Sequence, residues 1–390
     1  MKRFLCLLLT CLLALSAACA EPLGFGFVNA TDVALRKEPG GKRVHRLAKD
    51  TCVWIAESRT ARDGTLWYRI NAGVHENHAN YDFSGWMMAS FIDAGDELWH
   101  DIAAVSANRL GMIALRTDGT VETAGRPIVN SEGTAWVSVR GWADGYRNVR
   151  QVSVLPYLSY CLITEDGRYV AANGLPTPAL ASVSLRLVAD GGGALAITQD
   201  QRLICEDSRS SPRWLYPQNE PARDDLAHVV QIVQNHAFFL LRTDDGRVFA
   251  ACTEPASMPA SLPDWESWTD LVSVSTSDCG PNGANTPGGC TYYAGVRRDG
   301  SVLAAPQALA DVVAAWTDMA DVQLAPTYVL GLRQDGTAVS AGLFGHSAPD
   351  VSAWRGITAV AVADDYCVGI TETGGLVFAG EHIFMREGHS

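Results

Sequence analysis

The sequence lacks the features of a disordered chain. It has no long Gln, Ser or Pro tract, and 47% of its 390 residues are hydrophobic against 19% that are charged. Disordered chains bury too little apolar surface to offset the entropy of ordering, so this composition excludes a mainly disordered protein. The length exceeds one ordinary domain, and we expect two domains of unequal size.

The sequence also lacks membrane-spanning segments and the charge of a nucleic-acid-binding protein. After residue 20 no segment is apolar enough to cross a bilayer. Without the first 20 residues the chain has 28 basic and 43 acidic residues, a net charge of −15, and we expect no basic cluster that offsets this acidity locally. An acidic surface repels phosphate backbones, so nucleic acid is excluded as a partner.

The first 20 residues have the pattern of an export signal. Lys2 and Arg3 form a positive start, residues 4–17 are an apolar run too short to span a bilayer, and residues 18–20 (ACA) suit signal peptidase. We therefore predict a secreted or surface-associated chain that begins at Glu21. The alternative is a lipoprotein anchored through Cys19, although Ser16 stands where such a sequence normally has a Leu-like residue.

The sequence lacks the cysteine pattern of a fold held together by disulfides. Seven cysteines follow the leader, and an odd number cannot all pair within the chain. Cys279 and Cys290 bracket a turn-rich segment, GPNGANTPGG, and a bridge there would contribute roughly 2–3 kcal/mol. We predict this disulfide. A cysteine–metal site is the alternative, but no second pair or His is near in the sequence. The other five lie mostly in apolar strands, where buried, unreactive thiols are expected.

A repeated unit fills the chain from about Trp99 to Gly380. The clear copies read WHDIAAVSANRLGMIALRTDGTVETAG, WTDMADVQLAPTYVLGLRQDGTAVSAG and WRGITAVAVADDYCVGITETGGLVFAG. A further copy starts at Trp268 and is interrupted by the cysteine segment. Three weaker copies fill the middle of the chain, which makes seven units.

Each unit predicts three short antiparallel strands. An alternating strand precedes a more continuous apolar strand, which is typical of a strand covered on both faces. Asp-Gly then predicts a tight hairpin with a primed turn, because Gly tolerates positive φ. Two units depart from this, with Asp200-Gln201 and Gly374-Gly375. We interpret the Asp-Gly pairs as turns rather than calcium ligands, since no calcium-binding loop pattern surrounds them.

The recurrent tryptophans are interpreted as packing residues between units, with ligand-binding rings as the alternative: Trp99, Trp268, Trp316 and Trp354. Short strands at regular spacing, without amphipathic helices, predict radial closure rather than an open solenoid.

The units resemble repeats of the regulator-of-chromosome-condensation family through the motif W-x-D…G-L-[RK]-x-D-G-T-V-x-x-x-G. The resemblance implies an all-β fold with a seven-bladed β-propeller over residues 96–390. The family's namesake is a nuclear exchange factor for a small GTPase, a role that an export signal and an acidic surface exclude here. Secreted bacterial proteins with similar repeats include a β-lactamase inhibitor, so protein binding by one propeller face is an expectation.

Residues 21–95 do not follow the repeat. Their order L-R-x-x-P-G…W-Y-R-I…G-W-M resembles bacterial Src-homology-3 domains, and Leu35-Arg36, Trp67-Tyr68 and Gly85-Trp86 carry most of the match. The resemblance implies a small Src-homology-3-like β-barrel of a kind that often contacts cell-wall peptides. An insertion at residues 72–83 stands where a tight hairpin is usual, and we interpret its H-x-x-H as solvated histidines rather than a metal site.

No catalytic motif is recognisable: the sequence has no G-x-S-x-G elbow, no phosphate-binding Gly loop and no Cys–His arrangement in a family context. We therefore expect no enzyme activity, no cofactor and no metal. Long connections between units carry aromatic residues that make good binding anchors. The binding candidates are Trp136, Trp142, Tyr146, Trp214, Tyr216 and Trp265.

These observations predict an exported, non-enzymatic binding or scaffold protein. The barrel is expected to touch the cell wall, and the propeller face is expected to hold an extracellular protein or a cell-wall glycan or peptide. Two alternatives stay open: a wall-active hydrolase whose propeller hides a carboxylate site, and a protein inhibitor of an exported enzyme. A central cluster of acids would favour the hydrolase.

Overall fold

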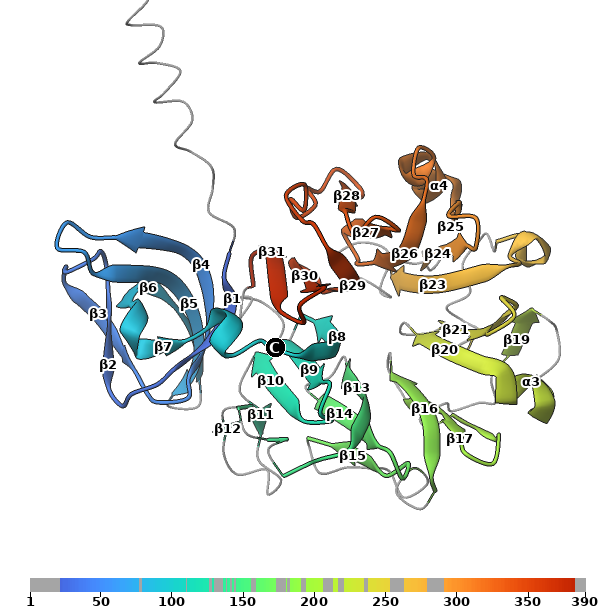
Figure 1. Ribbon diagram of the computed structural model, residues 1–390, viewed down its shortest axis with the longest axis horizontal. Helices are drawn as coiled ribbons and strands as arrows, with labels where there is room; N and C mark the ends of the chain where they lie inside the picture. The colour runs from blue at the N-terminus through green and yellow to red at the C-terminus, as the bar shows by residue number, and fades with distance from the viewer. Residues whose placement is uncertain are drawn as a thin grey trace, which may run out of the picture.

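The computed structural model describes residues 22–382 with internal gaps (Figure 1). The predicted leader with Cys19, and the predicted disulfide partners Cys279 and Cys290, lie outside the described residues. The gaps fall at residues 77–78, 110, 126–127, 130–135, 138, 141, 144, 156–158, 173–179, 181–182, 191–193, 206–212, 217–220, 235–237, 253–262 and 279–290.

The N-terminal strands form one seven-stranded antiparallel sheet in the order β3-β2-β6-β5-β4-β1-β7. Its core includes Leu35, Val53, Ile70 and Met87, which are fully buried. β5 and β6 pair without interruption as far as Glu76 and Ala79, so the predicted insertion is the outer part of a long hairpin. The strands are β1 (Gly24–Val28), β2 (Val33–Arg36), β3 (Arg43–Leu47), β4 (Cys52–Thr60), β5 (Leu66–Glu76), β6 (Ala79–Met88) and β7 (Ile92–Asp93).

The remaining larger sheets, six with three strands and one with four, lie radially around a centre, which is the arrangement of a β-propeller (Figure 1). The prediction of an all-β chain is confirmed. The first four are β8 (Ile102–Asn108), β9 (Gly111–Arg116) and β10 (Val121–Gly125); β13 (Val149–Leu155), β14 (Ser159–Thr164) and β15 (Tyr169–Ala171); β16 (Leu185–Asp190), β17 (Ala194–Thr198) and β18 (Leu203–Cys205); and β19 (Arg213–Tyr216), β20 (Val229–Gln234), β21 (Phe238–Thr243) and β22 (Val248–Cys252).

The last three radial sheets have the same antiparallel order. They are β23 (Leu271–Asp278), β24 (Thr291–Arg297) and β25 (Val302–Ala305); β26 (Met319–Leu324), β27 (Tyr328–Arg333) and β28 (Ala338–Gly342); and β29 (Ile357–Val362), β30 (Tyr366–Thr371) and β31 (Leu376–Gly380). The connections hold a two-stranded sheet and short helices, namely β11 (Ile128–Val129), β12 (Trp136–Val137), η1 (Ala89–Phe91), η2 (Gly95–Glu97), α3 (Arg223–His228), η4 (Trp265–Ser267) and α4 (Gln307–Val313).

The Asp-Gly hairpins differ from the predicted primed turn. In the first radial sheet the Gly119 N–H donates to the Arg116 carbonyl at 3.0 Å, and the Arg116 N–H donates to the Thr120 carbonyl at 2.8 Å. Gly119 has a φ of 78°, whereas Asp118 is not among the residues with positive φ. A primed type I′ turn needs positive φ at both central residues, so the loop is a type I turn followed by a left-handed Gly. The Asp side chain instead accepts from the Thr120 N–H at 2.9 Å.

The same turns join neighbouring radial sheets. At six junctions the N–H of the first residue of a sheet donates to the carbonyl of the turn residue of the preceding sheet, from 2.8 to 3.1 Å. The pairs are Val149 to Gly119, Leu185 to Gly167, Leu271 to Gly246, Met319 to Gly300, Ile357 to Gly336 and Ile102 to Gly374. The last of these links the final sheet to the first, so the described sheets form a closed ring.

The Asp of the W-x-D motif also has a backbone role. Asp101, Asp270 and Asp318 have φ between 55° and 60°, and Gly356 takes the same place with a φ of 61°. Asp, Asn and Gly adopt this left-handed conformation most readily. The Asp101 carbonyl accepts from the Thr117 N–H at 2.8 Å, which fixes the start of β8 against the end of β9.

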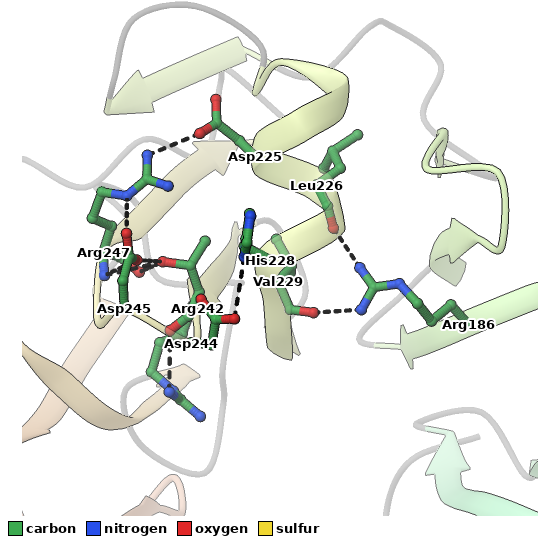
Figure 2. A network of polar contacts seen from close by, with 10 residues as sticks. Arg186, Asp225, Leu226, His228, Val229, Arg242, Asp244, Asp245 and Arg247 are labelled. Carbon is green, nitrogen blue, oxygen red and sulfur yellow. Dashed lines mark hydrogen bonds and ion pairs between the residues drawn. The ribbon is translucent and has the colours of Figure 1, made fainter.

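The junction between the third and fourth radial sheets lacks this backbone bond among the described residues, and the third sheet has Asp200-Gln201 in place of Asp-Gly. Figure 2 shows Arg186 of β16 reaching the carbonyl oxygens of Leu226, in α3, and Val229, at the start of β20. The bond to Val229 measures 2.6 Å. Beside it, the Arg223 Nε donates to the Asp200 carbonyl at 2.9 Å. Guanidinium groups therefore link these two sheets.

The recurrent tryptophans are packing residues, as predicted. Trp99, Trp268, Trp316 and Trp354 are 1–9% exposed and belong to the cores of the radial sheets. A Cβ atom built on Gly331 would lie 2.7 Å from the Trp316 ring. The Gly of the G-L-R motif therefore leaves room for the indole.

The N-terminal sheet and the ring of radial sheets share one hydrophobic core. Phe25 and Trp54 of the N-terminal sheet pack with Tyr366 and Phe378 of the last radial sheet, and all four are at most 2% exposed. The Trp99 indole N–H donates to the Phe25 carbonyl at 2.9 Å. The two units are thus joined by buried aromatic contacts.

Candidate functional site

A cleft of about 380 Å³ opens where the connections of the last two radial sheets meet. Its walls come from the segment after β28, the β29–β30 connection and the residue after β31. Asp364, Asp365 and Glu381 line it together with His346, and Tyr328 is part of its wall. Three carboxylates around one cleft attract a cationic group.

Hydrogen bonds hold the wall of this cleft in place. The Tyr328 hydroxyl lies 2.8 Å from the Ala363 carbonyl oxygen and 2.7 Å from that of Tyr366, and these two oxygens share its single proton. Burial raises the pKa of Tyr328 well above its usual range, so the phenol stays protonated as a donor. Glu381 accepts from the Asn71 side-chain amide of β5 at 2.9 Å, which ties this side of the cleft to the N-terminal sheet.

Two glycines that end repeats allow the connections to approach. A Cβ atom on Gly342 would lie 1.7 Å from the His346 carbonyl oxygen, and one on Gly380 would lie 2.3 Å from the Asp365 carbonyl oxygen. A larger residue at either position would displace the backbone that carries the cleft side chains. The final Gly of the repeat motif therefore shapes this site.

Phe344 stands in the same segment, two positions before His346, and is 58% exposed. Its φ of 54° is in the left-handed region, which is a genuine outlier for a bulky side chain. Its ring stacks on Tyr292 of β24 with centroids 5.3 Å apart. We call Phe344 together with the cleft residues His346, Asp364, Asp365 and Glu381 the Phe344 rim. Strained residues that persist at a surface point to function.

The predicted aromatic anchors have different environments. Trp142 is half-buried, with its ring centroid 6.2 Å from that of Tyr146 and 6.4 Å from that of Tyr160, so both predicted residues pack partly on the second radial sheet. Their role in binding stays a prediction. Trp265 is only 5% exposed and packs on Trp268, so it is a core residue rather than an exposed anchor. Burial between sheets removes the ring surface that a partner would need.

The other three candidates are placed by their backbones. Trp136 lies in β12 opposite Val129. Trp214 and Tyr216 lie in β19, the edge strand that pairs with β22. Their side chains lie outside the described part of the structure, and the structure does not bring the predicted residues together with the Phe344 rim.

Sequence reasoning missed the Phe344 rim. Its signal was an apolar pair, Leu343-Phe344, between two glycines in a polar connection, and adjacent carboxylates at Asp364-Asp365. Both follow strands at the same end of neighbouring sheets, where connections gather.

A second pocket, of about 310 Å³, lies on the N-terminal sheet. Arg36 and Trp67 both line it with Met88 and Phe91. The Arg36 guanidinium donates to the Gly41 carbonyl at 2.8 Å, so this side chain is held in place.

A half-buried acid, Asp321, lies among the radial sheets. Asp321 accepts hydrogen bonds from Ser273 and, at 3.0 Å, from Gln323, and desolvation raises its pKa. These contacts give it a structural role between β23 and β26. Within the described residues no group of three or more His, Cys, Asp or Glu is placed to hold a metal ion. Over the same residues, no helix has the length and apolarity needed to cross a membrane.

The fold and site define a radial all-β protein with an open, acidic cleft at its rim. No protein-family model matches the chain, and no curated protein matches it. The family resemblance of the repeats therefore stays a prediction.

Solved structures to which this chain is similar include three from plant, bacterial and yeast proteins. The CRINKLY WD40 ectodomain of the Arabidopsis thaliana receptor kinase ACR4 is 13% identical, with 73% of this chain and 96% of that chain covered and a TM-score of 0.47. BamB from Moraxella catarrhalis is 10% identical, with 87% of this chain and 99% of that chain covered and a TM-score of 0.35. Prp20p from Saccharomyces cerevisiae is 10% identical, with 94% of this chain and 93% of that chain covered and a TM-score of 0.34. These low scores carry no conclusion about function.

Proposed function

We propose that the chain is an exported, non-enzymatic binding protein that holds a protein partner at the Phe344 rim. In this proposal the radial sheets are the seven blades of one β-propeller, and the N-terminal sheet is a Src-homology-3-like barrel. The barrel adds a second contact, to cell-wall peptide, through the pocket lined by Arg36 and Trp67.

The observation that carries the proposal is the exposed ring of Phe344. Phe344 keeps an aromatic side chain 58% exposed on a left-handed backbone that is strained for a bulky residue, although its ring stacks on Tyr292. Exposed aromatic residues are typical anchors of protein interfaces. The cleft of about 380 Å³, lined by His346 two positions further along the chain, offers space for one side chain of the same partner.

The carboxylates of the rim define the partner's chemistry. Asp364, Asp365 and Glu381 would pair with a Lys or Arg side chain, while Phe344 packs on a neighbouring apolar residue. A partner segment with a basic residue beside an apolar one fits both parts. The net charge of the mature chain adds long-range attraction to such a segment.

The test is capture of proteins from a culture secretome by the full mature chain, followed by affinity measurement with the purified captured protein. Phe344→Ala should weaken binding at least tenfold, because anchor truncation typically costs more than about 1.4 kcal/mol. Leu66→Ala is the matched control, since Leu66 is also exposed, at 40%, but lies on the barrel. Asp364→Asn should weaken binding and reduce its salt dependence, whereas Glu372→Gln, at the opposite end of the last sheet, should not.

The outcomes separate the alternatives. If the captured protein is an exported enzyme that loses activity on binding, the chain is an inhibitor that uses this rim. Equal binding by Phe344→Ala and the native chain would overturn the rim as the site. Capture by insoluble wall glycan alone, or hydrolysis of that wall, would replace the proposed function with the corresponding alternative.

A further inference from the structure

The basic residues of the mature chain are unevenly distributed. Residues 21–95 contain nine basic and nine acidic residues, while residues 96–390 contain 19 basic and 34 acidic ones. All lysines after the leader lie at residues 37–49, and residues 96–390 contain none. The segment 36–49 (RKEPGGKRVHRLAK) has six basic residues against one acid, so the expectation that no local basic cluster offsets the acidity is wrong.

The structure places these residues at one border of the barrel. β3 is the edge strand of the seven-stranded sheet and pairs only with β2. We call the exposed cations of β3 and of the residues that flank it the basic edge: Lys37, Lys42, Arg43, Arg46 and Lys49. Arg46 pairs with Asp32, whereas the ion pairs found among the described residues include none of the other four. Four cations therefore face solvent with their charge available.

Apolar groups are exposed beside these cations. Val44 is 50% exposed, and the β2–β3 register passes from Leu35 opposite His45 to Arg36 opposite Arg43, so Val44 is a bulge residue. Tyr81 of β6 is 43% exposed. His45, the residue after Val44, stacks on Phe83 with ring centroids 3.8 Å apart, and Phe83 stacks on Tyr81 with centroids 6.1 Å apart.

The edge is unsuited to adding a strand from a partner. A bulge interrupts the hydrogen-bonding row, and Lys and Arg on an edge strand oppose pairing with another chain. The available interaction is therefore charge attraction by side chains, supplemented by a small apolar contact.

The position of the edge favours a planar anionic surface. β2 and β3 lie on the side of the barrel turned away from the radial sheets (Figure 1). A flat surface can touch this side while the acidic radial sheets, with 19 basic and 34 acidic residues, stay at a distance. A flexible polyanion in solution would meet repulsion from most of the molecule instead.

We propose that the basic edge binds the surface of an anionic phospholipid bilayer, with Val44 and Tyr81 at the level of the headgroups. Basic side chains near such a surface contribute about 1 kcal/mol each, and the effect falls off within a Debye length. Tyr is a residue that settles at membrane interfaces, with its ring in the apolar layer and its hydroxyl in water. The proposal does not depend on what the Phe344 rim binds.

Co-sedimentation of the full mature chain with vesicles tests the proposal. Vesicles of phosphatidylglycerol and phosphatidylcholine should bind the protein, vesicles of phosphatidylcholine alone should not, and salt should weaken the binding. Arg43→Gln should reduce the affinity for anionic vesicles about fivefold, because each charge contributes about 1 kcal/mol. The double variant Lys42→Gln with Arg43→Gln should reduce that affinity about 25-fold. Arg62→Gln, which removes an exposed cation from the turn between β4 and β5, is the control and should bind like the native chain.

Three results would overturn the proposal. The first is no binding to the anionic vesicles by a chain with a native circular dichroism spectrum. The second is an equal loss of affinity in Arg62→Gln and Arg43→Gln, which would indicate a general charge effect. The third is equally tight binding to lipid-free cell-wall polymer with the same dependence on Lys42 and Arg43, which would assign the edge to that polymer.

Discussion

The backbone N–H of Ile102 donates a 2.8 Å hydrogen bond to the carbonyl oxygen of Gly374, and so joins the first radial sheet to the last. The other junctions between sheets use the same bond, except the one held by Arg186. A ring closed in this way has no free end, so a local change at the closing turn affects the whole set of sheets.

Gly374→Ala should destabilise the ring. Gly374 has a φ of 77°, and a Cβ atom there would lie 3.0 Å from the Asp101 Cα. Left-handed backbone costs an L-residue roughly 1–2 kcal/mol, and the contact adds about 1–3 kcal/mol. Gly345→Ala is a matched control, because Gly345 has the same φ of 77° with nothing within 4 Å. Urea unfolding of both variants should show the larger loss for Gly374→Ala; equal losses would contradict the role of this junction.

Arg186→Leu should loosen the junction between the third and fourth radial sheets. The guanidinium supplies charged donors to the Leu226 and Val229 carbonyls, and hydrogen bonds to charged groups contribute about 1.5–3 kcal/mol. Arg202→Leu is the control, since its ion pair with Asp200 is exposed and exposed pairs contribute about 0–1 kcal/mol. Hydrogen exchange should increase in β16 and β20 of Arg186→Leu, and unchanged exchange there would contradict the prediction.

Phe378→Ala should uncouple the N-terminal sheet from the radial sheets. Phe378 is 2% exposed and packs on Phe25 and Trp54 of the N-terminal sheet. Removing a buried Phe side chain costs about 3–5 kcal/mol. Calorimetry should give one transition for the native chain and two for the variant, because the shared core is what couples the units. Two transitions in the native chain would mean that the interface contributes little.

Acid should weaken the hairpin turns. Hydrogen bonds from Thr243 and Arg247 lower the pKa of Asp245 from 3.8 to about 2. A depressed pKa in the folded state means that the turn contributes stability above about pH 4, which is lost as the pH falls toward 2. Asp245→Asn should therefore flatten the fall of the melting temperature between pH 4 and pH 2. An unchanged slope would show that this turn does not contribute.

Cys52 should resist alkylation in the folded protein. Burial raises the pKa of its thiol to about 12, and only the thiolate reacts. Iodoacetamide at pH 8 should leave Cys52 unmodified in the native chain and modify it in urea, as measured by peptide mass spectrometry. Rapid modification without denaturant would indicate that the barrel opens at this interface.

Some of the architecture could be predicted from the repeats. The four tryptophans of the W-x-D motif are buried as expected, since large apolar residues at equivalent positions must share one environment. The turn type was wrong, because Asp-Gly fits both a primed turn and a type I turn with a left-handed Gly. Only backbone angles such as those of Asp118 and Gly119 distinguish the two.

The candidate site was mostly beyond the reach of the sequence. Trp265 and Phe344 are both aromatic residues in connections, yet one is 5% and the other 58% exposed. Aromatic type alone does not decide exposure, which depends on whether neighbouring sheets cover the ring. Asp364, Asp365 and Glu381 meet His346 only because consecutive sheets bring their connections to one end.

The sequence by itself determined the all-β class, the repeated three-stranded unit, the buried tryptophans and the strong acidity, because these follow from local periodicity and composition. The tertiary structure decided how the ring closes from Ile102 to Gly374, that the barrel shares a core with the last sheet, and which side chains stay exposed. The physical reason is that these features depend on contacts between residues far apart in the chain. Such contacts exist only when the whole ring has assembled.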